Sequence, residues 1–371
     1  MNSARIATLG PVGTKDSFLL NASAYAGLRA VTSVMALYDI DATMRTFGDL
    51  GAWWGARDRK RLDRAETNLR RCLPHLSGAE VRDVALKSMR YLFQLFCAEI
   101  PMTPRLVTPS TWMNCFHFSR IDEALALLMS KRPVILITGH CGNFEILGFG
   151  LSVAGFPLTA LARPLDMPFI DDWVRDVRQR RGMGVLVKWG ASDAMTDILE
   201  RGGRLAFIAD QNAGDRGMFV PFFGRLASAY KSIGLLALRY DIPIVCGVAR
   251  RLGPDAFKYE IECVDLIWPR DWHQLEDPLF YITARYSRAI EAMVRRAPDQ
   301  YFWVHRRWKS RPRHELEGRP FPTALKRKLE ALPWMTSDDL ARVLENSARD
   351  ARELNPLREC PAAQPEPLQP A

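Results

Sequence analysis

The chain has 371 residues, of which 48% are hydrophobic and 25% are charged, so it can bury a full hydrophobic core in one large domain with appendages or in two small domains. Lys and Arg number 51 against 42 Asp and Glu, and the net charge of +9 favours acidic partners such as anionic lipid or an acidic carrier protein. The basic stretches carry no helix-turn-helix or RNP-type pattern, so we expect no nucleic-acid partner.

Several site types are disfavoured by the sequence. The seven cysteines form no CxxC pair and lie mostly in apolar surroundings, as is typical of reduced residues in a cytosolic compartment. The histidines lack metal-ligand spacing, so we expect no metal. There is no P-loop, no nucleotide-binding glycine run after a strand and no G-x-S-x-G nucleophile turn.

The first 130 residues are expected to form an N-terminal helical region that associates with a membrane. Residues 81–96 repeat their apolar positions near the helical period. The segment 18–38 is mostly apolar but is interrupted by Asn21 and Arg29, which makes it a poor spanning helix. It suits a helix that lies at the membrane interface; a helix of the protein core is the alternative.

Residues 131–310 are predicted to be an α/β catalytic core. We expect strands at 134–138, 158–162, 184–188, 204–209, 218–222, 243–249 and 257–265. We expect helices between and after them, at 145–154, 167–181, 193–201, 228–240 and 275–296. This alternation implies crossover connections and a mostly parallel central sheet flanked by helices.

Residues 311–371 are expected to be a C-terminal tail that is helical first and Pro-rich afterwards. Two helices are predicted at 322–331 and 337–353. The last stretch, 361–371, is rich in proline and is predicted to be disordered.

The most informative motif follows the first predicted strand. In the run Thr138-Gly139-His140-Cys141-Gly142-Asn143-Phe144-Glu145, the strand delivers a histidine to its carboxyl edge, where open α/β sheets place their chemistry. His140 is predicted to be a general base, and Glu145 to fix its tautomer and stabilise the imidazolium. Residues five apart on a helix diverge by roughly 140°, so these two converge only if His140 lies in the turn before the helix. Cys141 is disfavoured as a nucleophile because no further histidine or amide partner is signalled nearby.

Three further runs carry chemistry-bearing residues. Asp210-Gln211 closes a predicted strand, where Asp210 either supports the histidine or caps the loop. The run 217–224 ends in Phe223-Gly224, which forms either part of a substrate pocket or only a strand end and turn. The run 298–309 places His305-Arg306-Arg307 among aromatics, as in an interfacial stripe. A buried histidine beside two surface arginines is the alternative.

Together with the His140–Glu145 run, these motifs resemble the bacterial lipid A biosynthesis (late) acyltransferase family, within the lysophospholipid acyltransferase group. The resemblance covers roughly residues 15–310. It implies a glycerolipid acyltransferase-like fold, and transfer of a fatty acyl chain from an acyl-carrier-protein or CoA thioester to a hydroxyl of a membrane glycolipid such as a lipid A precursor. His140 and Glu145 match the family's catalytic pair. The thioester is a co-substrate, and no cofactor is expected.

The resemblance also implies an arginine between the catalytic histidine and the Asp-Gln run. Arg178 is the best match and Arg163 a second candidate for binding an oxyanion or a phosphate, a role that suits a guanidinium fork. The alternative is that the helix 167–181 is simply basic on its outer face. Asn143, Asp210, Gln211, Phe223 and Gly224 are expected to support these residues or to bind substrate.

We expect direct attack of the acceptor hydroxyl on the thioester, at the cytoplasmic face of a bacterial inner membrane with an anionic surface. The protein would be peripheral or shallowly anchored through its N-terminal helix. Two alternatives stay open: a non-catalytic basic lipid-binding protein, which would have no need of the His140–Glu145 pair, and a thioesterase, in which water replaces the lipid hydroxyl.

Overall fold

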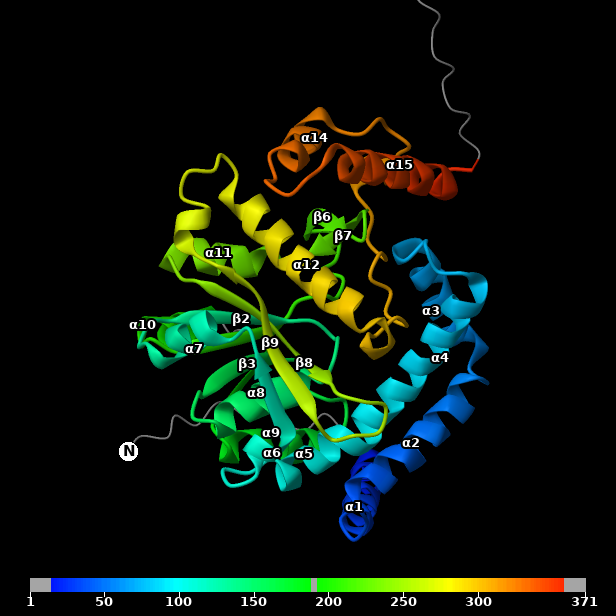
Figure 1. Ribbon diagram of the computed structural model, residues 1–371, viewed down its shortest axis with the longest axis vertical. Helices are drawn as coiled ribbons and strands as arrows, with labels where there is room; N and C mark the ends of the chain where they lie inside the picture. The colour runs from blue at the N-terminus through cyan, green and yellow to red at the C-terminus, as the bar shows by residue number, and fades with distance from the viewer. Residues whose placement is uncertain (1–14, 188–191, 357–371) are drawn as a thin grey trace, which may run out of the picture.

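The computed structural model describes residues 15–187 and 192–356. The chain begins with helices that lie along one side of the molecule (Figure 1): α1 (Lys15–Met35), α2 (Ile40–Gly55), α3 (Arg59–Cys72), α4 (Gly78–Gln94), a π-helical turn (Leu95–Glu99) and α5 (Ile100–Leu106). A capping box starts α4, because the Ser77 side chain accepts from the Glu80 N–H and the Glu80 carboxylate accepts from the Ser77 N–H.

Helix α1 lies on the surface. Phe18, Leu19 and Leu20 are each more than half exposed, and Leu37, just beyond the helix, is 83% exposed. The alternative interpretation of 18–38 as a helix of the protein core is therefore wrong for most of α1, although Met35 at its end is buried. Across residues 15–187 and 192–356, no helix combines the length and the apolar character that crossing a membrane requires.

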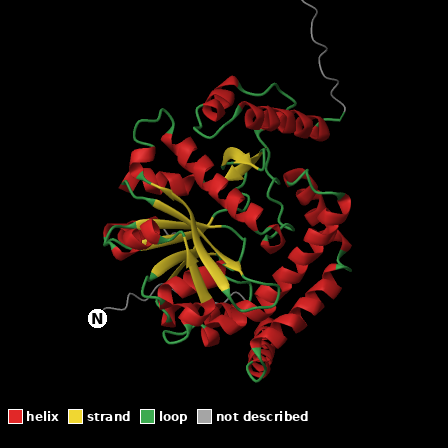
Figure 2. Cartoon of the chain, in the orientation of Figure 1, coloured by secondary structure: helices red, strands yellow, loops and turns green. Residues whose placement is uncertain are grey.

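A seven-stranded sheet forms the centre of the molecule (Figure 2), as predicted. Its spatial order is β1 (Phe116–Ser119), β9 (Tyr259–Ile267), β8 (Ile244–Arg251), β2 (Val134–Thr138), β5 (Arg204–Ile208), β3 (Leu158–Ala162) and β4 (Met183–Val187). Neighbouring strands are parallel except β8 and β9, so the sheet is mostly parallel.

Helices cover both faces of the sheet. They are α6 (Trp112–Cys115), α7 (Asp122–Met129), α8 (Phe144–Val153), α9 (Pro168–Arg180), α10 (Ser192–Glu200), α11 (Lys231–Tyr240) and α12 (Pro278–Arg296). Side chains of β2 alternate between the faces, as the strand period requires. Ile135 and Ile137 belong to the core that includes α11 and α12, whereas Val134 and Leu136 belong to a core that includes α7.

Strand β1, strand β7 and the start of α11 differ from the sequence predictions. The short strand β1 lies in a region predicted to be helical, and it pairs with β9. Strand β7 (Arg225–Ala229) forms a hairpin with β6 (Met218–Phe222), so α11 begins at Lys231 and not at 228. The expected strand at 184–188 is found as β4, with position 188 outside the described residues, and the predicted disorder at 361–371 also lies outside them.

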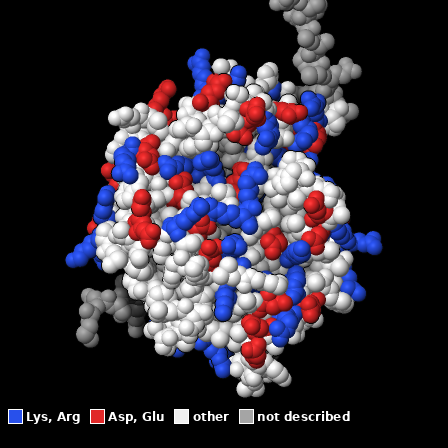
Figure 3. Space-filling view, in the orientation of Figure 1, with Lys and Arg blue, Asp and Glu red and all other residues white. Residues whose placement is uncertain are grey.

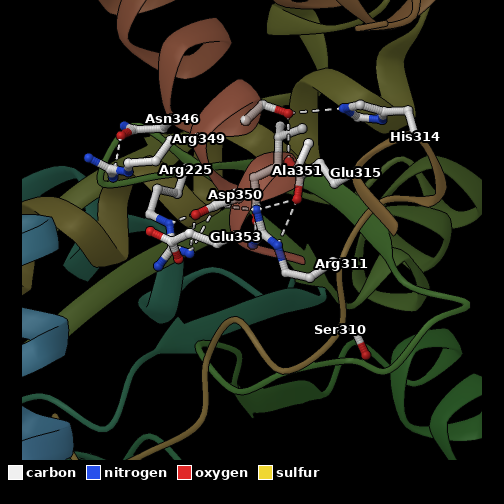
Figure 4. Close-up of polar contacts among 12 residues, drawn as sticks. Arg225, Ser310, Arg311, His314, Glu315, Asn346, Arg349, Asp350, Ala351 and Glu353 are labelled. Carbon is white, nitrogen blue, oxygen red and sulfur yellow. Dashed lines mark hydrogen bonds and ion pairs between the residues drawn. The ribbon is translucent and has the colours of Figure 1, made fainter. Parts of the chain in front are cut away.

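The C-terminal segment packs back on the core. After the 3-10 turns Pro269–Asp271 and Pro298–Gln300 come α13 (Arg313–Leu316), α14 (Thr323–Glu330) and α15 (Ser337–Leu354). Figure 4 shows Asp350 of α15 between Arg225 of β7 and Arg311. The Asp350 carboxylate accepts from Arg225 Nε at 3.0 Å and from Arg311 Nη2 at 2.6 Å, and all three residues are buried. Buried charges need such partners, so this network joins α15 to the β6–β7 hairpin.

Candidate active site

The loop between β2 and α8 holds the predicted histidine. Asn143 caps α8, because its Oδ1 accepts from the Ile146 N–H at 2.8 Å. Gly142 has φ of +60°, and a Cβ there would lie 2.2 Å from the Ala249 carbonyl oxygen, so only glycine fits this turn. His140 therefore lies in the turn before the helix, as predicted.

Backbone contacts hold this loop from two further segments. The His140 carbonyl accepts from the Phe302 N–H at 3.1 Å, and the Gly142 N–H donates to the Gln300 carbonyl at 2.9 Å. The Asn143 side-chain amide donates to Glu99 Oε2 at 2.6 Å, and Glu99 is buried in an ion pair with Arg251. Asn143 thus fixes the position of the loop through a buried polar network with Glu99 and Arg251.

The imidazole of His140 pairs with Asp210. Its Nδ1 lies 2.7 Å from Asp210 Oδ1. A carboxylate only accepts hydrogen bonds, so Nδ1 carries a proton, and in the neutral imidazole the free lone pair is on Nε2. The Gln211 side-chain amide nitrogen lies 3.3 Å from Nε2, and the rings of Phe144 and Phe302 lie 5.0 and 6.0 Å from the imidazole between centroids. This geometry suits a general base whose tautomer is fixed.

Asp210 is kept ionised by its surroundings. Burial would raise the pKa of its carboxyl, but the charge and hydrogen bond of His140, with the charge of Arg307, outweigh burial and lower the pKa below its ordinary value. Of the two placements that the sequence left open for Asp210, the structure shows the one in contact with the histidine.

The Asp210–Gln211 loop is held by the run after η3 (Pro298–Gln300). Arg307 is 2% exposed and donates to the carbonyls of Gln211, at 3.3 Å, and Ser228. The expectation of two surface arginines is therefore wrong for Arg307, although Arg306 is exposed. His305 Nε2 accepts from the Asn212 N–H at 3.2 Å, and burial lowers the pKa of His305 to about 4, so it is neutral at pH 7.

Glu145 does not contact His140 in this structure. Its two carboxylate oxygens accept from Nε and Nη2 of Arg178, each at 2.6 Å, in a bidentate pair between α8 and α9. The predicted His140–Glu145 contact is wrong, because Glu145 lies in the first turn of α8 and faces α9. The neighbouring strand β5 instead brings Asp210 to the imidazole.

An apolar cavity of about 380 Å³ lies beside the Glu145–Arg178 pair, between the sheet and helices α7 and α8. Its charged lining residues are Glu145, Arg178 and Glu262, and most of the others are Leu, Ile, Val, Ala, Phe and Met. Phe144 lines the cavity and also contacts the His140 ring. The cavity is therefore mostly apolar, carries the Glu145–Arg178 ion pair in its wall, and reaches the imidazole through the Phe144 ring.

The remaining predicted site residues lie elsewhere. Arg163 has a side chain that is 73% exposed, and its partner is Asp166 at 3.5 Å. Phe223 and Gly224 form the two-residue turn between β6 and β7, with φ of 54° and 68°. They do not line the apolar cavity, so the expectation of a strand end and turn describes them.

Sequence reasoning missed the buried position of Arg307. The run His305-Arg306-Arg307 is uniformly basic, and its alternation between exposed and buried side chains follows from the carbonyls of Gln211 and Ser228 that Arg307 reaches. The only sequence signal was the flanking aromatics Phe302, Trp303 and Trp308, which predict that the segment packs on the core.

Comparison with known proteins gives a family match over most of the chain. The model of the family described as bacterial lipid A biosynthesis acyltransferase matches residues 14–310. A lipid A biosynthesis acyltransferase of Haemophilus influenzae is 25% identical over 69% of this chain and 78% of its own length. A lipid A biosynthesis palmitoleoyltransferase of Escherichia coli K12 is 25% identical over 71% of this chain and 85% of its own length. A lipid A biosynthesis lauroyltransferase of the same organism is 25% identical over 68% of this chain and 81% of its own length.

Proposed function

Because the chain belongs to the bacterial lipid A biosynthesis acyltransferase family, which confirms the resemblance found in the sequence, we propose that it transfers a fatty acyl chain from a thioester to a hydroxyl of a lipid A precursor or a similar membrane glycolipid. The observation that carries this proposal is the His140–Asp210 pair, joined through the Phe144 ring to a large apolar cavity. A base and a hydrocarbon site are the two parts that such a reaction requires.

His140 activates the acceptor in the proposed reaction. Its Nε2 takes the proton of the hydroxyl as the oxygen attacks the thioester carbonyl carbon, and a tetrahedral intermediate forms. The intermediate collapses with loss of the thiolate, which takes the proton back from the imidazolium and leaves as a thiol. Between the uptake of the proton and its return, Asp210 stabilises the imidazolium, and it keeps Nδ1 protonated throughout. No acyl-enzyme is formed, and no cofactor is needed.

Arg178 is the proposed donor to the oxyanion. Its Nε and Nη2 are occupied by Glu145, and the pair with this buried carboxylate holds the guanidinium at the cavity. No hydrogen-bond partner of Nη1 occurs among the described residues, so this nitrogen is free to donate to the thioester oxygen. A well-placed donor of this kind is worth roughly 3–4 kcal/mol in the transition state.

The apolar cavity is the proposed site of the acyl chain. A water-sized group needs roughly 10–15 Å³ of such space, so a cavity of about 380 Å³ has room for the methylenes of a fatty acyl chain. Each methylene that leaves water contributes about 0.8 kcal/mol to binding. The chain would then hold the thioester beside Glu145 and Arg178, which line the same cavity.

The proposed location is the cytoplasmic face of the bacterial inner membrane. The exposed apolar side chains of α1, among them Phe18, Leu19 and Leu20, would lie in the lipid interface. The net charge of +9 favours an anionic membrane surface, and it equally favours an acyl-carrier-protein or CoA thioester as the donor.

The test is mass spectrometry of lipids from a host that expresses the wild-type chain or His140→Ala at matched, folded levels. We expect a lipid that is heavier by one acyl group and present only with the wild type. Purified protein is assayed in parallel with a long-chain acyl thioester and acceptor lipid. Equal transfer by a folded His140→Ala protein would disprove the mechanism. Release of free fatty acid without acylated lipid, in the presence of acceptor, would instead indicate a thioesterase.

A further inference from the structure

A second cleft, of about 430 Å³, lies between α3, the β6–β7 turn, α12 and α15. Five arginines line it, and Glu353 is its one acidic lining residue in the described structure: Arg70, Arg71, Arg295, Arg342 and Arg349. Figure 3 shows Lys and Arg side chains gathered over α12, the helix that contributes Arg295. We refer to this feature as the arginine cleft. Helix α15 lies beyond residues 14–310, so the cleft is partly built by a segment outside the family match.

The carboxylates around the arginine cleft already have partners. Glu353 pairs with Arg71 at 2.7 Å, and Glu291 pairs with Arg295 at 2.6 Å. Asp350 is surrounded by Arg225, Arg311 and Arg71.

Two of the five lining arginines are left without an acid. In the part of the chain that the structure describes, Arg342 and Arg349 have no carboxylate within ion-pair distance, and Arg349 donates only to the neutral Asn346 Oδ1, at 2.6 Å. The cleft therefore holds more positive charge than its own acids neutralise.

Packing contacts position two of these arginines, Arg342 and Arg295. A Cβ on Gly224 would lie 2.9 Å from Arg342 Cδ, so the arginine stem packs directly on the hairpin turn, and Asn346 Nδ2 donates to the Gly224 carbonyl at 2.8 Å. The Arg295 guanidinium lies 4.6 Å from the centre of the Phe223 ring. Behind them, burial lowers the pKa of Arg225, and the charges of Arg311 and Arg71 lower it further against the opposing effect of Asp350.

We propose that the arginine cleft binds a phosphorylated ligand. Guanidinium groups match phosphate oxygens in bidentate geometry, and a cleft that already holds several of them in place spends little entropy on ordering them. A ligand with two or more phosphates suits the number of arginines and the volume of about 430 Å³. The phosphates come either from a lipid headgroup or from a soluble compound, and both present the same chemistry. This site is separate from His140 and goes beyond the proposed acyl transfer.

The first experiment is calorimetric titration of the full chain with pyrophosphate. The test variant is Arg342→Ala/Arg349→Ala, because both side chains are exposed and neither has an acidic partner whose charge would be left uncompensated. The control is Arg327→Ala, which removes an exposed arginine of α14 outside the cleft. We expect saturable binding by the wild type, weakened about tenfold or more by the double substitution, since a charge-assisted hydrogen bond contributes at least that factor. The control is expected to stay within about twofold.

A second arm identifies the source of the phosphate. Flotation with phosphatidylcholine vesicles, with and without phosphatidic acid, is measured for the same three proteins. Loss of phosphatidic-acid binding in the double variant alone supports a lipid headgroup, and an effect confined to pyrophosphate supports a soluble ligand. Binding that the double substitution leaves unchanged, or no saturable binding in either arm, overturns the proposal. Neither result bears on His140, so acyl transfer is tested separately.

Discussion

His140 and Asp210 are 70 residues apart in the sequence, yet their Nδ1 and Oδ1 atoms lie 2.7 Å apart. The register of two neighbouring parallel strands explains this contact. Each residue of β2 faces the β5 residue 70 positions later, up to Thr138 and Ile208 at the ends of the two strands. Two residues beyond each strand end lie the histidine and the aspartate. The pair is therefore a direct product of the sheet topology.

The first prediction distinguishes the catalytic roles of two carboxylates, Asp210 and Glu145. Asp210→Asn should lower kcat by on the order of 10²–10⁴, the range expected when a general base loses its support. Glu145→Gln should lower kcat by a smaller factor, because Glu145 acts on catalysis only through the Arg178 guanidinium that it holds at the cavity. Steady-state kinetics of both purified variants measure the difference. A larger kcat loss in Glu145→Gln than in Asp210→Asn would reverse the assignment.

The second prediction concerns stability. Arg178→Met leaves the mostly buried Glu145 carboxylate without its partner and should cost about 1–3 kcal/mol of unfolding free energy. The double variant Glu145→Gln/Arg178→Met should regain part of this loss, as urea denaturation of the four proteins of a double-mutant cycle would show. The matched control is Arg180→Met, which breaks an exposed pair with Asp176 on the same helix and should cost less than about 1 kcal/mol. Additive effects in the cycle would contradict the coupling.

The third prediction uses the apolar cavity. Ala124 of α7 lines it, so Ala124→Leu should shorten the longest acyl chain that the protein transfers. Ala126→Leu adds the same volume on the exposed side of the same helix and should leave the chain-length distribution unchanged. Mass spectrometry of products formed from a mixture of acyl thioesters gives both distributions. If the two variants give the same products, the acyl chain binds elsewhere.

The fourth prediction is a pH effect at His305. The pKa of His305 is lowered from 6.5 to about 4 in the folded protein, so between these values the unfolded chain binds the proton and the folded protein does not. Stability is therefore lost as the pH falls from 6.5 towards 4. His305→Gln keeps an acceptor for the Asn212 N–H and should make this loss smaller. Urea denaturation midpoints at pH 7 and pH 5 measure this loss. An equal loss in both proteins would argue against a neutral, half-buried His305.

The sequence predicted the parts of the site that depend on local pattern. The apolar run 134–137 identified a buried strand, and the run that follows placed His140 in a turn before a helix. It also indicated that Asp210 closes a strand. It could not show that this strand lies next to β2, because strand order depends on long-range packing, and the histidine was therefore matched with the nearer carboxylate, Glu145.

Two other features depended on contacts that sequence periodicity does not report. Strand β1 has four residues, too few for an alternation to stand out from the helices around it, and it is stabilised by pairing with β9 from far along the chain. Arg307 is buried because two backbone carbonyls and Asp210 surround it, and a run of basic residues gives no sign of such partners.

The ion network around Asp350 also links the core to a helix that lies beyond the family match. Removal of α15 would leave the guanidinium groups of Arg225 and Arg311 buried, facing each other without the carboxylate that separates them. Arg311 follows Ser310, whose hydroxyl accepts from the Asn212 side-chain amide at 3.2 Å, two residues after Asp210. A protein shortened to end at 310, where the family match ends, would lack both Arg311 and Asp350. Arg225 would then lose its carboxylate partner, and expression of the core alone would require a new residue at 225.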